Sequence, residues 1–285
     1  MKTILILTSI LMLSSNAQSA ASLESICHEL SSSIKDSDTL KKFSCDFKIL
    51  SQKESESSET PGKICQDYAN RTLGLPKLPN ITRPESSKIT LLPDGRVQIR
   101  VEHGVIAKVT LKEMGWWYRN LANPKVLKNK SNNCLPYIIL DADHIGVKAK
   151  DVLPSGEIKA GSTIHVEEMT HFANKAYHLE EDLLISEITD KYMRQEKRKL
   201  FGISLGVTLG QTDRYFTEEN GGVRVVSILT AGIDSKKHPK LSNLNKILIK
   251  KLFPSGNQNA WINHTTEEVS NLTVFIPWLL SKQPK

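Results

Sequence analysis

The C-terminal stretch 260–280 constrains the fold most, because its side chains have helical spacing and it follows several short strand-like runs. Its apolar face carries Trp261, Leu272, Phe275 and Leu279. His264 and Glu268, four residues apart, project side by side from the same face. A helix with such a face needs a surface that covers it. The order of elements therefore favours a sheet that packs on this helix.

Short runs with strand character precede the helix at 137–148, 162–169, 178–188, 200–209 and 223–231, separated by turn residues. An Asp94-Gly95 turn between β-rich runs predicts a hairpin over 89–101. Thr110 and Glu113 fit a capping box, which predicts a helix that carries Trp116 and Trp117. A further helical pattern covers 241–253. Together these patterns predict an α+β domain whose curved antiparallel sheet wraps the last helix.

The N-terminus has the pattern of a secretory signal peptide over residues 1–20, with Lys2, a short apolar run and then small residues. No later stretch approaches about 18 uninterrupted apolar residues. We therefore expect an exported protein, periplasmic or secreted, with no membrane insertion. The four cysteines are Cys27, Cys45, Cys65 and Cys134. Disulfides are expected in this compartment, and three connectivities are open.

Two regions are expected after the signal peptide: a Ser/Glu-rich, partly disordered extension over 21–83, and a metal-binding domain over 84–285. The net charge of +7 comes from scattered basic residues, without the interleaved aromatic residues typical of nucleic-acid binding. A solvated basic surface is the favoured interpretation, and nucleic acid is not an expected partner.

A metal site needs further ligands beside the helix, and strand residues supply candidates. His144 follows an apolar run. In 163–169, alternation places Glu168 on one face with Ile164 and Val166, and Glu167 on the other. Glu168 is the inward carboxylate if the apolar face is buried. A bulge or a register shift of one residue would select Glu167 instead.

Two imidazoles and two carboxylates suit zinc best, with manganese and iron as alternatives. Each residue also has a structural interpretation. His264 and Glu268 could form a surface pair, and His144 could be a satisfied core histidine. Asp141 and Asp143 could be turn residues.

Segments 114–117, 137–145, 161–169, 264–272 and 276–277 resemble, in order and spacing, the 2,4-diacetylphloroglucinol hydrolase family. The resemblance covers about 105–280. It implies a helix-grip fold, similar to Bet v 1-type plant allergens and START-type steroid carriers. It also implies zinc held by His144, Glu168 or Glu167, His264 and Glu268.

One departure concerns the substrate, since residues 140–142 read Leu-Asp-Ala where the family has a Trp-His-Pro-like segment. The activity implied is hydrolysis of the carbon–carbon bond that joins an acyl group to a phenolic ring, by metal-activated water. The leaving ring needs a proton, and Tyr137, Asp143 and His165 are the catalytic candidates because they lie near the ligands in sequence. Asp143 could instead orient a metal ligand.

The expected partner is a small aromatic or phenolic substrate, and a homodimer is an open alternative. Two other functions compete with the hydrolase. One is a non-catalytic periplasmic carrier of an apolar ligand, and the other is a zinc esterase or lactonase on the same fold.

Overall fold

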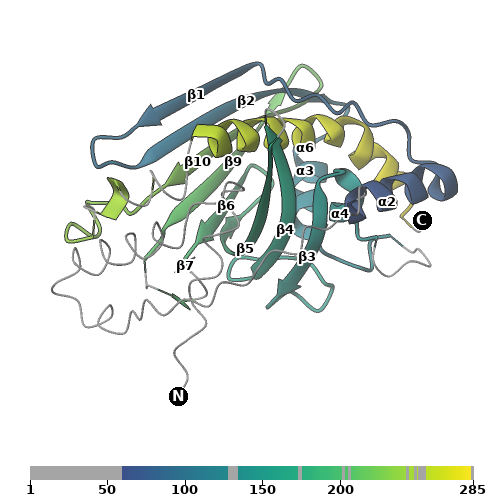
Figure 1. Cartoon of the computed structure of the whole chain (residues 1–285). Helices are drawn as coiled ribbons and strands as arrows, with labels where there is room; N and C mark the ends of the chain where they lie inside the picture. The colour runs from purple at the N-terminus through teal and green to yellow at the C-terminus, as the bar shows by residue number, and fades with distance from the viewer. Residues whose placement is uncertain are drawn as a thin grey trace.

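The computed structural model describes residues 60–127, 134–172, 175–200, 203–204, 207–241, 244–246, 249 and 255–283 (Figure 1). The elements in this part of the chain are α2 (Pro61–Tyr68), the π-helical turn η2 (Ala69–Leu73), β1 (Ser86–Leu91), β2 (Val97–Ala107), α3 (Leu111–Asn120), α4 (Pro136–Leu140), β3 (His144–Lys150), β4 (Thr163–Phe172), β5 (Lys175–Ile188), β6 (Tyr192–Lys197), β7 (Lys199–Leu200), β8 (Ile203–Ser204), β9 (Gly210–Glu219), β10 (Gly222–Ala231) and α6 (Ser255–Ser281).

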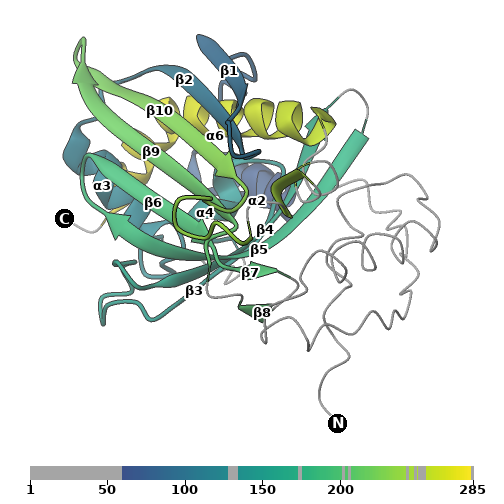
Figure 2. The same ribbon diagram turned by 90° about the vertical axis from the view of Figure 1, so that its left-hand side faces the viewer.

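Eight of these strands form one antiparallel sheet in the order β1-β2-β10-β9-β6-β5-β4-β3, and β7 pairs with β8 separately. The sheet curves around α6, which lies along its concave face (Figures 1 and 2). The helix packs mainly on β2 and β4. The predicted α+β, helix-grip architecture is therefore confirmed.

The main core lies between α6, the sheet and α3. Phe275 of α6 is fully buried, and its ring meets the edge of Trp117 at a centroid distance of 5.3 Å. Trp117 is buried while Trp116 is only partly so, which shows that one of the two predicted tryptophans anchors α3 under the sheet. Burial of each large side chain contributes roughly 1.5–3 kcal/mol, so this packing holds the helix in the grip.

Two local predictions are confirmed. β1 and β2 form the hairpin, and Gly95 in its turn has a φ of 82°, a conformation that favours glycine. The capping box at the start of α3 is complete, because the Thr110 hydroxyl accepts from the Glu113 amide and the Glu113 carboxylate accepts from the Thr110 amide.

The predicted strand over 137–148 is wrong in its first part. Pro136 begins the helix α4, where its missing N–H costs nothing. The Asp141 carboxylate then accepts from the Asp143 amide at 2.9 Å in a turn, and strand β3 begins at His144. An apolar run of this length does not distinguish a short buried helix from a strand.

Other strand predictions differ in detail. Within the described part of 200–209, only Leu200 and the pair Ile203–Ser204 belong to strands. Strands β6 and β9 were not predicted, because charged side chains interrupt the apolar alternation in both. The helical pattern at 241–253 falls largely outside the described residues.

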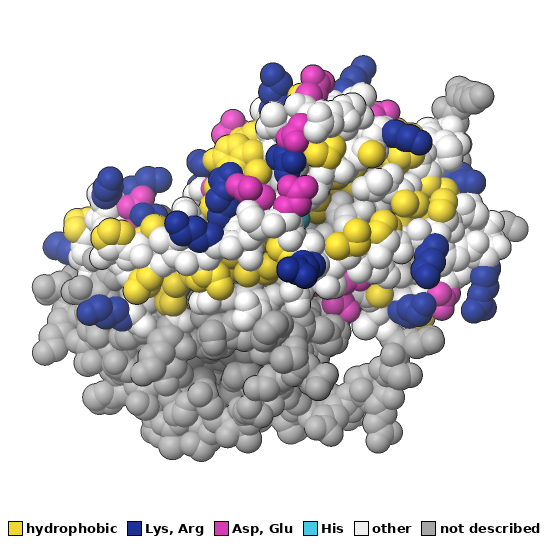
Figure 3. All heavy atoms as spheres, turned by 90° about the horizontal axis from the view of Figure 1, so that it is seen from above, with side chains coloured by type: hydrophobic (Ala, Val, Ile, Leu, Met, Phe, Trp, Pro, Cys, Tyr) yellow, Lys and Arg dark blue, Asp and Glu magenta, His cyan; other side chains and the backbone are white. Residues whose placement is uncertain are grey.

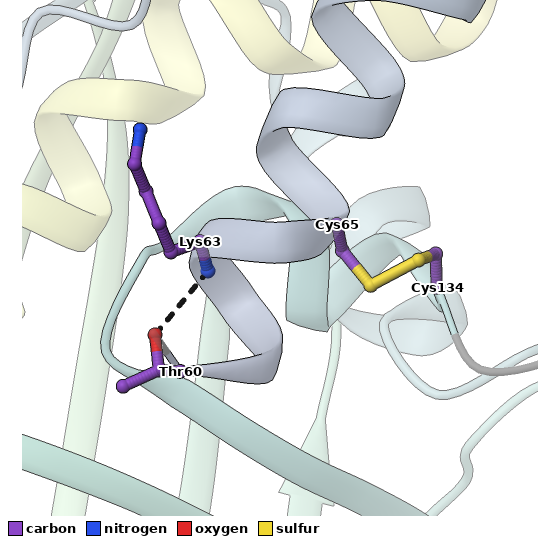
Figure 4. The surroundings of a disulfide bond; sticks show 4 residues. All are labelled: Thr60, Lys63, Cys65 and Cys134. Carbon is purple, nitrogen blue, oxygen red and sulfur yellow. Dashed lines mark hydrogen bonds between the residues drawn. A yellow bond between two sulfur atoms is a disulfide. The ribbon is translucent and has the colours of Figure 1, made fainter. Parts of the chain in front are cut away.

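The boundary predicted at 83/84 is too late, since residues 60–83 belong to the folded domain. Helix α2 packs on α4 and β3, and Ala69 is fully buried. A disulfide joins Cys65 to Cys134 (Figure 4). The signal peptide, Cys27 and Cys45 lie outside the described residues. Among the described helices, none is long and apolar enough to cross a membrane.

Candidate metal centre

Three buried side chains meet between the sheet and α6. His144 begins β3, Glu168 lies on β4 and His264 lies on α6. Each offers one ligand atom, and these atoms all lie within 4.8 Å of one another. The β3–β4 register places His144 directly opposite Glu168, and α6 brings His264 from above. Residues separated by 120 positions in the chain therefore form one cluster.

His144 is oriented for metal binding by its own hydrogen bond. Its Nδ1 lies 2.5 Å from the carbonyl oxygen of Tyr137, which only accepts, so Nδ1 carries the proton. Its ring also stacks on the Tyr137 ring at 3.9 Å between centroids. The Nε2 atom then keeps its lone pair, and it has no hydrogen-bond partner among the described residues. This is the tautomer that a metal ligand requires.

His264 lies between carboxylates. Its Nε2 is 3.3 Å from Glu168 Oε2, while Asp141 and Asp143 lie 3.9 and 4.0 Å from its Nδ1. Burial alone would lower the pKa of His264, but the negative charge of Glu168 outweighs it and raises the pKa to about 10. The proton on His264 therefore occupies the position that a cation could take.

Glu168, not Glu167, is the inward carboxylate. The strand alternates in burial, and Glu168 is 8% exposed, on the face that meets the helix. Burial would raise the pKa of Glu168, yet the charge and the hydrogen bond of His264 lower it to about 2. The Tyr137 hydroxyl donates to this carboxylate. Burial and the charge of Glu168 raise the pKa of Tyr137 well above its usual value, so the hydroxyl keeps its proton.

Glu268 is buried on the same face of α6 as His264, but it lies outside the three-residue cluster. Its Oε2 is 3.4 Å from Nη2 of Arg214, on β9. The structure thus brings together three of the four ligands expected from the sequence. It directs the fourth, Glu268, towards the guanidinium of Arg214.

The catalytic candidate His165 does not reach the centre. It lies with Glu167 on the opposite face of β4 from Glu168, and its Nδ1 is 2.9 Å from Asp182 Oδ1. The structure does not bring this candidate to the cluster, because neighbouring strand residues point to opposite faces. Asp143, by contrast, lies beside His264 together with Asp141.

Two residues of the site were missed or undervalued. Asp141 was considered only as a turn residue, but it is fully buried and its Oδ2 has no hydrogen-bond partner among the described residues. Its position directly after the apolar run 136–140 was the available signal. Arg214 lies in a strand that was not recognised, so nothing in the local pattern indicated that it points inward.

Two imidazole nitrogens and one carboxylate oxygen are a donor set that fits zinc, and a catalytic zinc ion commonly has three protein ligands and one open position. The free Nε2 of His144 supports the fit, because a buried polar atom without a partner is costly. A cation at this point would satisfy it.

No family model matches the chain, and no curated protein does. Among solved structures, the KanY protein is 9% identical, over 68% of this chain and 99% of that one, with a TM-score of 0.37. Protein Ms6760 from Mycobacterium smegmatis is 11% identical, over 70% and 100%, with a TM-score of 0.36. Major latex-like protein 151 from Panax ginseng is 11% identical, over 62% and 98%, with a TM-score of 0.35. Likeness at this level carries nothing about activity.

Proposed function

We propose that the chain is an exported zinc-dependent hydrolase that cleaves the carbon–carbon bond between an acyl group and a phenolic ring. The buried cluster of His144, Glu168 and His264 is the observation that carries this proposal. Its chemistry agrees with the resemblance to the 2,4-diacetylphloroglucinol hydrolase family, which implies the same three ligands. The proposed substrate is an acylated phenol.

The cluster would hold zinc through Nε2 of His144, Nε2 of His264 and the Glu168 carboxylate. The resemblance implies Glu268 as the fourth ligand, and it lies one helical turn from His264 on the same face of α6. When bound, zinc supplies a Lewis acid and lowers the pKa of water.

The chain's own groups have separate roles in this proposal. Asp141 and Asp143, on the Nδ1 side of His264, orient that ring. Tyr137 fixes Glu168 through its hydroxyl. Tyr137 is also the proposed donor of the proton that the leaving ring carbon needs: its hydroxyl would exchange the hydrogen bond to Glu168 for that carbon, and its phenolate would regain a proton from water.

Export is part of the proposal. The disulfide between Cys65 and Cys134 supports it, because disulfides form and persist in oxidising compartments such as the periplasm and the medium. The signal-peptide pattern of residues 1–20 is the corresponding feature of the sequence.

Two neighbouring glutamates provide a matched test of the metal centre. Glu168→Gln removes the inward carboxylate, and Glu167→Gln makes the same change on the opposite face of β4. Loss of a group that only supports a metal ligand weakens metal binding by up to about 100-fold. Glu168 is a proposed ligand itself, so we expect Glu168→Gln to weaken zinc binding by more than this. Glu167→Gln should leave zinc binding unchanged. Zinc is measured by plasma mass spectrometry and by competition with a chromogenic chelator.

Activity is measured in parallel as release of the free acid from acylated phenols by the zinc-loaded chain. Equal zinc affinity in the two variants would refute the site. A chain that binds zinc and hydrolyses esters or lactones, but no acylated phenol, would replace the proposed reaction. A chain that takes up no offered zinc, and retains an apolar ligand, would be a carrier.

A further inference from the structure

Arg214 is a buried cation in the interior of the grip. It lies on β9, near the middle of the eight-stranded sheet, and only 8% of the residue is exposed. Its guanidinium lies over the ring of Tyr118 at 5.7 Å from the centroid. Arginine is seldom buried without a function or full pairing, because taking the charge out of water is costly.

The pairing of Arg214 is incomplete. Its Nη1 donates to Gln195 Oε1 at 2.6 Å, and its Nη2 donates to Glu268 Oε2 at 3.4 Å, a long distance for a charged hydrogen bond. Its Nε is buried and has no hydrogen-bond partner among the described residues. A guanidinium offers five donors in a planar fork, so Arg214 retains capacity for an oxygen acceptor.

A second polar group beside Arg214 is also incompletely paired. Ser227 lies opposite Arg214 in the β10–β9 register and is 3.0 Å from Nε2 of His103, on β2. The Nδ1 of His103 has no hydrogen-bond partner in the part of the chain that the structure describes. Burial lowers the pKa of His103 to about 3, so the ring is neutral and adds no competing positive charge.

Arg214 connects to the metal centre through Glu268, which contacts it from the same face of α6 that carries His264. We propose that Arg214 binds an ionised oxygen of the substrate ring, and that it selects phenolates over neutral aromatic compounds. This inference rests on the function proposed above. It adds a specificity residue that the family resemblance did not indicate.

The test uses the zinc-loaded full chain and two probes, 2,4,6-trihydroxyacetophenone and its trimethyl ether, at a pH above the first pKa of the phenol. Binding is followed by quenching of tryptophan fluorescence. Arg214→Met should weaken binding of the phenol by about 10- to 100-fold and leave binding of the ether unchanged, with both chains saturated with zinc. Arg194→Met is the matched control, because Arg194 lies on neighbouring β6 and contacts Asp213 on the opposite face of the sheet.

Unchanged phenol binding in Arg214→Met would overturn the inference. Equal weakening of both probes, or equal affinity of the original chain for both, would also overturn it. If Arg214→Met does not fold, Arg214→Lys keeps the charge without the fork, and a reduced preference for the phenol is the expected result. An unchanged preference in Arg214→Lys would then count against the role of the fork.

The failures of the two proposals are distinguishable. A chain that prefers the phenol through Arg214, but cleaves no acylated phenol, would refute the hydrolase and keep the binding role. A chain that cleaves acylated phenols with the same kcat and KM in Arg214→Met would refute the binding role alone.

Discussion

At the residue scale, the centre is held together by carboxylates around a protonated His264. A metal cation can take the place of that proton. Glu168 faces the Nε2 of His264, while Asp141 and Asp143 lie on its Nδ1 side. Without metal, a proton on His264 balances the carboxylates. Zinc can bind His264 only after this proton leaves, so metal binding and proton release are coupled at this residue.

The metal-free chain should therefore lose stability as pH rises. The pKa of His264 is about 10 in the folded chain against 6.5 for an unperturbed histidine, so its contribution is full below about 6.5 and disappears as pH rises through 10. The lowered pKa of Glu168, about 2 against 4.5, gives a contribution that is full above about 4.5 and is lost as pH falls through 2. Urea unfolding of the chelator-treated chain should show a decrease on the order of a few kcal/mol between about pH 6 and 10.

His264→Gln is the control for this profile. Its free energy of unfolding should change much less over the same pH range, because glutamine does not titrate. A variant with the same slope as the original chain would show that another group is responsible.

At the element scale, α2 supports the centre by packing on α4 and β3. Gly62 packs against the backbone that leads into β3. A Cβ at this position would lie 2.7 Å from the carbonyl oxygens of Ala142 and His144, and closer still to that of Asp141. Real Cβ atoms do not approach a backbone oxygen so closely. The helix can therefore pack here only because residue 62 is glycine.

Gly62→Ala should move α2 away from the turn before His144. We expect a loss of about 1–3 kcal/mol in the free energy of unfolding, typical of overpacking, together with weaker zinc binding. Lys63→Ala is the control on the same helix, since the Lys63 side chain is 50% exposed. The control should change stability by no more than about 0.5 kcal/mol. Denaturant unfolding and zinc competition measure both effects, and normal zinc binding in Gly62→Ala would separate α2 from the centre.

At the scale of the whole molecule, the Cys65–Cys134 disulfide attaches the segment before the sheet to the domain that carries the site. It joins α2 to the chain just before α4 and closes a separation of 69 residues (Figure 4). A cross-link of this length restricts the unfolded chain strongly. The surface seen in Figure 3 mixes basic, acidic and hydrophobic side chains, as expected from the scattered charges of the sequence.

Replacement of both Cys65 and Cys134 by serine should lower the free energy of unfolding by about 2–5 kcal/mol. Zinc binding should persist in the folded variant, because neither cysteine belongs to the cluster. Chemical denaturation with and without reductant measures the loss. Reductant should destabilise the original chain more than the variant, and equal sensitivity would contradict a stabilising role for this disulfide.

Local chemical signals in the sequence determined several elements. Helical spacing indicated α6 and placed His264 on its inner face, and period-two alternation chose Glu168 over Glu167 once the apolar face was known to be buried. The Asp94-Gly95 turn and the Thr110–Glu113 box are equally local, because each depends on atoms a few residues apart. Such signals do not depend on long-range contacts, and they were sufficient for the fold class and three metal-ligand candidates.

Tertiary structure decided what depends on contacts between distant segments. It made 136–140 a helix, because burial on α2 and α6 does not require a strand. It placed residues 60–83 in the domain, and it turned Arg214 inward to face Glu268. Packing of the Glu168 face of β4 on α6 left His165 on the side away from the centre. Sequence periodicity shows which face of an element is apolar. Only the packing of one element on another shows which side chains meet at the contact between them.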